Sequence, residues 1–337
     1  MHGFNGMKNL SRLLQKSLFV IPEVFIGNPV FFKIKDFWIP AFAGMTAKRI
    51  PSILLQAALL IKVPRLRLLF FISLLICLFN APFAYSEQIT GSGCSVSNLG
   101  YLTELAKDYE KLTGEKVLIR GGGSATGIDD LRTGRVDFAA SCRHMTKDDP
   151  KDIEFIQVAW DALVAIVHKS NPVSSISLDD IRAIYAGKIT NWKQLKGADK
   201  AINLFISKPS KGHGLSGVET SVNELIFKGN QPQDIPDATY LASTGIVEQM
   251  IEKTAEGFAI AGFLSSRKRD VKILKLNGVY PDKQSISTGK YPYKRPLFIL
   301  AAKNPRPEVK KFIDFALSKK GQELISSYGA ISLSDIK

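Results

Sequence analysis

The sequence predicts an α/β protein built on mainly parallel sheets, and three observations support this fold class. From Gln88 onwards, short apolar runs typical of strands alternate with segments whose apolar residues recur at helical spacing. Two clusters rich in glycine and serine each separate an apolar run from a helix-like run. Two longer apolar runs, at 162–168 and 296–302, flank the middle of the chain, and each is expected to be a strand that crosses between two lobes. Such alternation is typical of parallel sheets covered by helices.

The first part of this region is expected to form one sheet. Apolar residues from Leu99 to Leu112 recur at helical spacing, and a second, shorter helix is expected over 127–133. Because crossovers between parallel strands are right-handed, the ends of the strands should gather along one sheet edge, where open α/β sheets bind ligands. The expected strands are 88–91, 117–119 and 136–140.

The middle and the end of the chain continue the alternation. Ser177 and the two aspartates after Leu178 indicate the start of a helix that runs to Tyr185. Strands are expected at 202–206 and 258–263, and helices from 216 to 227, 245–253, 308–317 and 322–328. The last two helices are predicted to return to the first lobe.

The two glycine- and serine-rich clusters, 121–127 and 211–217, predict two anion-binding loops that face each other. The first turn of a helix has backbone N–H groups without intrahelical partners, so a glycine-rich approach leaves donors aimed at a small anion. The alternative is an ordinary turn with a serine N-cap, and the segment from Ser216 to Glu219 fits a capping box.

Charge does not point to nucleic acid. The net charge is +14, but residues 1–86 hold 10 of the 45 Lys and Arg and 2 of the 31 Asp and Glu. That segment therefore carries +8 and residues 87–337 carry +6. No arginine-rich stripe or aromatic stacking motif accompanies the remaining charge, so we expect no nucleic-acid partner. A weakly basic protein still favours anions.

Residues 62–86 have the organisation of a signal peptide, with basic residues, an apolar run at 68–79 and a small-x-small site that ends at Ser86. Export to the periplasm with cleavage after Ser86 is predicted, and the alternatives are an uncleaved membrane anchor or a lipoprotein attached at Cys77. Residues 1–61 are expected to be a leader that is either not native, from a start codon assigned too early, or disordered.

The remaining residues offer little for catalysis or for a metal. Only Cys94 and Cys142 remain after the predicted cleavage, and neither has a CxxC partner. The histidines do not supply further ligands at a recognisable spacing, so no metal or other cofactor is expected. No nucleophile elbow and no histidine with a matched acid and nucleophile is present, and no enzymatic activity is predicted.

Over about residues 88–334 the chain resembles the phosphate-binding proteins of ABC transporters, a family of type II periplasmic substrate-binding proteins. The resemblance implies a two-lobed periplasmic-binding-protein fold with two crossings, in which residues 87–167 and 297–337 form lobe 1 and residues 168–296 form lobe 2. It also implies a monomer that captures phosphate or a similar oxyanion for an ABC permease in the inner membrane. The segments that carry it are 90–95, 122–124, 134–141, 184–192 (Ile-Tyr-Ala-Gly-Lys-Ile-Thr-Asn-Trp) and the tail from Tyr291 to Gln322.

The resemblance also implies a set of ligand-contacting residues. Ser95 corresponds to a hydroxyl donor of the first loop, Ser124 with the amides of Ala125 and Thr126 to the second, and Ser216 substitutes for a hydroxyl of the opposite lobe. The full expected set is Cys94, Ser95, Ser124, Ala125, Thr126, Cys142, Arg143, Lys208, Gly212, His213, Gly214 and Ser216.

Two positions depart from the family. Cys142 stands where the family has an aspartate that accepts the ligand's proton, which leaves the preference for phosphate over sulfate open. The family's second-lobe arginine falls near Pro209, where Lys208 is the nearest cation. Arg143 either pairs with the ligand or with a neighbouring acid.

The cysteines and the altered contacts leave two further questions. In the fold that the resemblance implies, Cys94 and Cys142 fall at the ends of neighbouring strands, which suggests a disulfide as a hypothesis. An extracytoplasmic sensor or interaction module on the same fold, with altered or lost anion binding, is the alternative function.

Overall fold

The computed structural model describes residues 30–34, 37–41, 88–208 and 216–336. It divides into two compact units, Met1–Ala84 and Tyr85–Lys337. In the first unit the described residues form an antiparallel pair, β1 (Val30–Ile34) and β2 (Phe37–Ala41). The predicted signal peptide at 62–86 lies outside the described residues.

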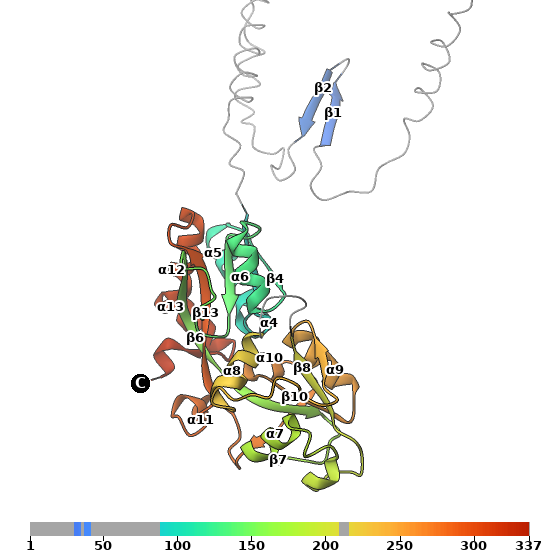
Figure 1. Ribbon diagram of the computed structural model, residues 1–337. Coiled ribbons are helices and arrows are strands. Elements are labelled where there is room, and N and C mark those ends of the chain that lie inside the picture. The colour runs from blue at the N-terminus through green and yellow to red at the C-terminus, as the bar shows by residue number, and fades with distance from the viewer. Residues whose placement is uncertain (1–29, 35–36, 42–87, 209–215, 337) are drawn as a thin grey trace, which may run out of the picture. The chain divides into compact units, whose positions relative to one another are not determined.

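The second unit is a two-lobed α/β structure, which confirms the predicted fold class (Figure 1). Two strands, β6 (Ile153–His168) and β13 (Lys294–Ala302), run through both lobes and pair antiparallel with each other. They correspond to the two apolar runs that the sequence assigned to crossings. The sequence placed the start of β6 at residue 162, nine residues too late, because the polar residues Glu154, Gln157 and Asp161 interrupt the apolar residues of its first part.

Lobe 1 carries three parallel strands in the order β4-β3-β5, and β5 then pairs antiparallel with β13. The C-terminal helices α12 and α13 return to this lobe, as predicted. Its elements are β3 (Ile89–Gly93), α4 (Ser95–Ser97), the π-helical turn η2 (Asn98–Leu102), α5 (Thr103–Thr113), β4 (Val117–Gly121), α6 (Ser124–Arg132), β5 (Phe138–Ser141), α12 (Pro307–Leu317), α13 (Lys319–Ser327), β14 (Ile331–Ser332) and η4 (Leu333–Asp335).

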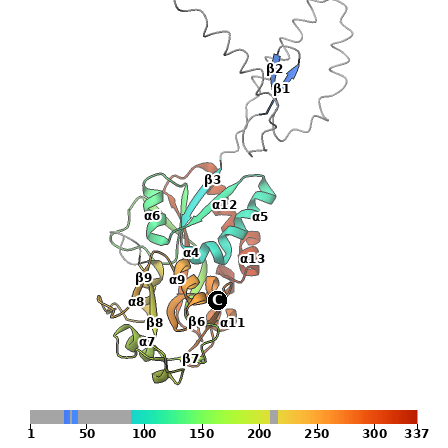
Figure 2. The same cartoon turned by 90° about the vertical axis from the view of Figure 1, so that its right-hand side faces the viewer.

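Lobe 2 carries the parallel strands β10, β8 and β9, and β10 pairs antiparallel with the second half of β6. Figure 2 shows α8 and α9 beside these strands, below the helices of lobe 1. Its elements are β7 (Ser175–Ile176), α7 (Leu178–Tyr185), η3 (Trp192–Leu195), β8 (Asn203–Ser207), α8 (Gly217–Leu225), β9 (Thr239–Leu241), α9 (Thr244–Lys253), β10 (Gly257–Gly262), α10 (Phe263–Ser266), β11 (Val271–Ile273), β12 (Lys275–Leu276) and α11 (Lys283–Ser287).

Local sequence rules account for several of these elements. The Ser177 hydroxyl accepts from the Asp180 amide, and the Asp180 carboxylate accepts from the Ser177 amide, so α7 begins with a complete capping box. α5 buries Leu105, Ala106 and Tyr109 on one face and ends at Gly114, whose φ of 77° closes the helix in the left-handed region.

The motif at 184–192 is structural. Tyr185 and Trp192 are fully or almost fully buried, and the Trp192 indole N–H donates to the Glu256 carbonyl at 2.9 Å. Burying large aromatic side chains with such polar partners stabilises the core of lobe 2. The motif therefore supports the fold rather than contacting a ligand.

Candidate functional site

The C-terminal ends of β3, β4 and β5 meet at one edge of the lobe 1 sheet, as the sequence predicts. Gly93 at the end of β3 pairs with Gly121 of β4 on one side and with Ala140 of β5 on the other. Each strand leads into residues of the expected ligand-contacting set. Cys94 and Ser95 follow β3, the first glycine cluster follows β4, and Cys142 follows β5.

The first glycine cluster opens α6 and leaves its first amides available. Gly123 is the N-cap with a φ of 93°, and its amide donates to the Gly93 carbonyl at 2.9 Å. The first intrahelical bond runs from the Gly127 amide to the Gly123 carbonyl at 3.1 Å. The amides of Ser124, Ala125 and Thr126 therefore have no intrahelical acceptor, which is the arrangement that binds anions at helix starts.

The second loop enters α8 from lobe 2, and its last residue is the N-cap Ser216. The Ser216 hydroxyl accepts from the Glu219 amide at 3.2 Å. The capping box that the sequence predicted here is wrong, because the Glu219 side chain turns into the lobe and accepts from the Gln231 amide at 3.0 Å. Burial raises the pKa of Glu219 to about 7. Gly212, His213 and Gly214 lie outside the described residues.

The starts of α6 and α8 face each other across the lobes at Gly217. A Cβ placed on Gly217 would lie 2.4 Å from the Ser124 hydroxyl and 2.7 Å from the Cys142 sulfur. Only glycine permits this approach. A further contact joins the lobes here, since the Ser221 hydroxyl of α8 donates to the Cys142 carbonyl at 3.2 Å. The starts of α6 and α8 thus belong to one candidate site in which the lobes are closed on each other.

Ser95 faces a third helix start. It is the half-buried first residue of α4, and a Cβ placed on Gly245 of α9 would lie 3.4 Å from its Cβ and 3.6 Å from its hydroxyl. α9 belongs to lobe 2, so Ser95 also lies between the lobes. Thr244, the residue before Gly245, donates its hydroxyl to the Ser207 hydroxyl at 3.2 Å, and the Ser207 hydroxyl in turn hydrogen-bonds that of Ser216. The surface of lobe 2 next to Ser95 therefore carries several hydroxyl groups.

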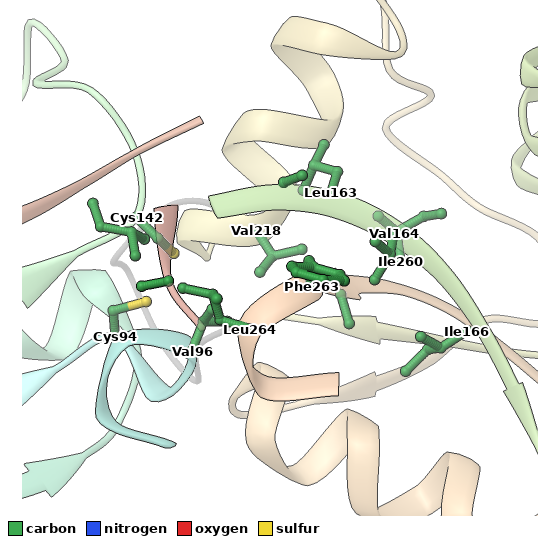
Figure 3. Packing of buried hydrophobic residues seen from close by; sticks show 14 of the residues in the cluster. Cys94, Val96, Cys142, Leu163, Val164, Ile166, Val218, Ile260, Phe263 and Leu264 are labelled. Atoms are coloured by element: carbon green, nitrogen blue, oxygen red, sulfur yellow. The ribbon is translucent and has the colours of Figure 1, made fainter. Parts of the chain in front are cut away.

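Cys94 and Cys142 lie beside each other at the end of the hydrophobic core, with Val96 and Leu264 close by (Figure 3). Both are free thiols, so the disulfide hypothesis is wrong for this structure. A hydrogen bond from the Cys94 thiol and the charge of Arg295 lower the pKa of Cys142 to about 6, although burial opposes the shift. Burial and the same hydrogen bond raise the pKa of Cys94. Cys142 is thus the member of the pair that ionises first.

Arg295 is a residue of this site that sequence reasoning did not select. It is 2 % exposed on β13, and its Nε and Nη2 donate to Asp161 Oδ2 on β6 at 3.1 Å and 2.8 Å. Its Nη1 lies 3.5 Å from the Gly217 carbonyl at the start of α8. The signal in the sequence was a charged residue immediately before each of the two strongly apolar runs, Asp161 before 162–168 and Arg295 before 296–302, since buried charges require partners.

Arg143 and Lys208 have partners within the protein. The Arg143 guanidinium makes two hydrogen bonds to the Asp149 carboxylate, at 2.6 Å and 2.8 Å, and both side chains are buried. Asp149 is therefore the neighbouring acid that the sequence analysis gave as the alternative partner of Arg143. Lys208 is exposed at the end of β8, and its ammonium lies 5.0 Å from the centre of the Tyr240 ring.

The fold and the site together define a class of protein, the periplasmic-binding-protein fold with its ligand site between two lobes. The family model for the PBP superfamily domain matches residues 84–320. The chain is 30% identical over 269 residues to the phosphate-binding protein PstS of Borreliella burgdorferi, a match that covers 76% of this chain and 94% of the relative. The chain therefore belongs to the phosphate-binding protein family, as the sequence motifs indicated.

Solved structures agree with this assignment. An ABC-type phosphate transport receptor from Vibrio cholerae is 28% identical, with a TM-score of 0.54 over 72% of this chain and 99% of that one. A protein from Clostridium perfringens, described as a phosphate ABC transporter substrate-binding protein with bound phosphate, has a TM-score of 0.65 over 73% of this chain and 100% of that one. At 23% identity, that second likeness concerns the fold.

In the part of the chain that the structure describes, no helix is long and apolar enough to cross a lipid bilayer. No cluster of three or more histidine, cysteine, aspartate or glutamate side chains there has the geometry of a metal site.

Proposed function

We propose that this chain is an exported receptor that captures phosphate or a similar oxyanion between its lobes and delivers it to an ABC permease. One observation carries the proposal. The starts of α6 and α8, from opposite lobes, face each other around the Ser124 hydroxyl, which lies against Gly217. Helix starts with free amides and hydroxyl groups favour a small anion over a neutral or cationic ligand.

The proposed contacts follow from this geometry. Ser124 and the amides of Ala125 and Thr126 would bind from lobe 1, with Ser95 beside them, and Ser216 would bind from lobe 2. Arg295 supplies a buried positive charge close to Cys142. Cys94 acts through its hydrogen bond to Cys142. Arg143 and Lys208 would reach the ligand only by leaving their present partners, and the proposed set also includes Gly212, His213 and Gly214.

The names of the relatives support the same function. The Borreliella burgdorferi relative is named a phosphate-binding protein, and the Vibrio cholerae protein is described as an ABC-type phosphate transport receptor. Neither description is that of an enzyme. We accordingly propose a monomeric receptor without catalytic activity, with residues 62–86 as its signal peptide, residues 87–167 and 297–337 as lobe 1, and residues 168–296 as lobe 2.

Isothermal titration calorimetry tests the proposal. The protein is stripped of bound ligand by mild unfolding and refolding, then titrated with phosphate, sulfate and molybdate at two pH values. We expect tight phosphate binding, and at least tenfold weaker binding by Ser124→Ala, since a lost hydrogen bond to a charged group costs about 1.5–3 kcal/mol. Ser175→Ala, which changes an exposed serine on β7, is the matched control.

The outcome also separates the two functions. If none of the three anions binds, the fold assignment stands but the receptor proposal fails, and the sensor or interaction module becomes the better description. If sulfate binds as tightly as phosphate, Cys142 does not provide the selectivity that an aspartate provides in the family.

A further inference from the structure

The thiol pair lies where lobe closure takes place. The Cys94 amide donates to the Ala140 carbonyl at 2.8 Å, which holds the start of α4 beside the end of β5. Cys94 is 1 % exposed and Cys142 is 2 % exposed. Cys142 is buried partly by its own lobe and partly by α8 of the other lobe, because Gly217 and Ser221 both contact it.

The contact at Gly217 leaves no room for an added atom on the Cys142 sulfur. A Cβ on Gly217 would approach that sulfur to 2.7 Å and the Ser124 hydroxyl to 2.4 Å, distances at which neighbouring groups must move. The Ser124 hydroxyl lies on the other side, since it accepts from the Cys142 amide at 3.2 Å and lies 3.6 Å from the Cys142 sulfur. Any group bonded to this sulfur must therefore displace α8.

The electrostatic surroundings favour a reactive sulfur at this position. Cys94, the N-cap of α4, hydrogen-bonds Cys142, and the Arg295 guanidinium of β13 lies near enough to stabilise the Cys142 thiolate, while Asp161 of β6 opposes this. A thiolate is the nucleophilic form of cysteine. Withdrawal of α8 would expose a sulfur that is already prepared to react.

We propose that Cys142 is a thiol-modification site that opens only when lobe 2 moves away, and that an adduct on its sulfur prevents lobe closure. The predicted effect of the adduct on anion binding rests on the proposed function, because it assumes that closure of the lobes captures the anion. The reagent class is a small disulfide or thiosulfonate. The Cys142 thiolate attacks one sulfur, a new S–S bond forms, and the leaving group departs with the electron pair of the broken bond. A thiol reductant reverses the reaction.

The probe is methyl methanethiosulfonate, which adds a single S–CH₃ group and releases methanesulfinate. The full chain is labelled with and without saturating phosphate, and peptide mass spectrometry separates Cys142 from Cys94 and Cys77. We expect phosphate to slow the labelling of Cys142 at least tenfold. Labelled protein should bind phosphate at least tenfold more weakly, and a thiol reductant should restore binding.

Two variants and one further measurement make the test specific. Cys94→Ser keeps a hydrogen-bond donor beside Cys142 and prevents Cys94 from attacking the adduct. In Cys142→Ser, treatment with the reagent should leave phosphate affinity as it was before treatment. Small-angle X-ray scattering should show a larger radius of gyration for the labelled protein than for the unlabelled protein in phosphate.

The outcomes distinguish the two proposals. Labelled protein that binds phosphate as tightly as unlabelled protein overturns the modification-site proposal. If unlabelled protein binds no phosphate, the receptor proposal fails, and X-ray scattering alone decides the modification-site proposal. A larger radius of gyration after labelling supports the modification-site proposal, and an unchanged radius rejects it.

Discussion

Two buried arginine–aspartate pairs flank the site and differ in what they connect. Arg143 and Asp149 are six residues apart, and their bidentate pair connects two residues of the same short segment of lobe 1. Arg295 and Asp161 are 134 residues apart and join the two crossing strands, β13 and β6. The first pair therefore organises a loop, whereas the second fastens the connection between the lobes.

The comparison shows which arginine is able to influence the ligand site. Both terminal nitrogens of Arg143 are engaged by Asp149 and by the His144 carbonyl, which accepts from Nη1 at 2.8 Å. Arg295 uses Nε and Nη2 on Asp161, while Nη1 lies toward the Gly217 carbonyl at 3.5 Å. Proximity in the sequence favoured Arg143, and the fold places Arg295 at the contact between lobes.

Breaking the two pairs should have unequal effects on stability. Arg295→Met leaves Asp161 as a buried carboxylate whose remaining partner is the Leu264 amide at 3.0 Å, and should lower the free energy of unfolding by about 3–5 kcal/mol. Arg143→Met should cost less, about 1–3 kcal/mol, because Asp149 keeps bonds from the Thr146 amide and hydroxyl. Urea denaturation followed by circular dichroism measures both.

The double variant with Arg295→Met and Asp161→Leu serves as a control for this prediction. It removes both charges, so it should recover part of the stability that the single change loses. If the two single changes lowered the free energy of unfolding equally, the ion pair between the crossing strands would be no more important for stability than the ion pair within the loop.

A buried carboxylate with a more distant arginine should behave differently from Asp149. Burial raises the pKa of Glu248 from 4.5 to about 7, although the hydroxyls of Ser265 and Ser266 and the charge of Arg269, 3.6 Å from Oε2, oppose the shift. Burial acts on Asp149 too, but the hydrogen bonds from Arg143 and Thr146 outweigh it and lower the pKa of Asp149. The balance between burial and the partners of the carboxylate decides the sign of the shift.

This difference predicts the pH dependence of stability. Because the folded-state pKa of Glu248 is raised, its contribution is complete below pH 4.5 and is lost as the pH rises through about 7, by up to about 3 kcal/mol. Glu248→Gln should therefore gain stability relative to the wild type between pH 5 and pH 8 in urea denaturation. Glu323→Gln, an exposed change on α13, should show a constant difference over that range.

Most of the fold followed from the sequence because each element carries a local signal. The apolar alternation, the capping residues of α7 and the glycine at the end of α5 all act within a few residues. The early part of β6 did not follow, because Glu154, Gln157 and Asp161 interrupt its apolar residues, whereas residues 162–167 form an uninterrupted apolar run. Its pairing with β13 comes from residues more than a hundred positions away.

The site was predictable in part for the same reason. Ser124 and Ser216 stand at helix starts, which the sequence marks with glycine and serine. The role of Gly217 depends on two lobes meeting, and the partner of Arg295 depends on the register of two distant strands. No local pattern contains either fact, so both had to come from the structure.

An exposed pair between the lobes should have the smallest effect. The His144 Nδ1 of lobe 1 lies 3.7 Å from Glu224 Oε2 of α8, and the two side chains are 60% and 54% exposed. Exposed pairs contribute about 0–1 kcal/mol, so Glu224→Gln should weaken phosphate binding by less than about fivefold. Because the interaction is between exposed charges, added salt should reduce the effect. Calorimetry at low and at high salt measures it, and a loss that is equal at both would show that Glu224 supports closure through packing rather than through its charge.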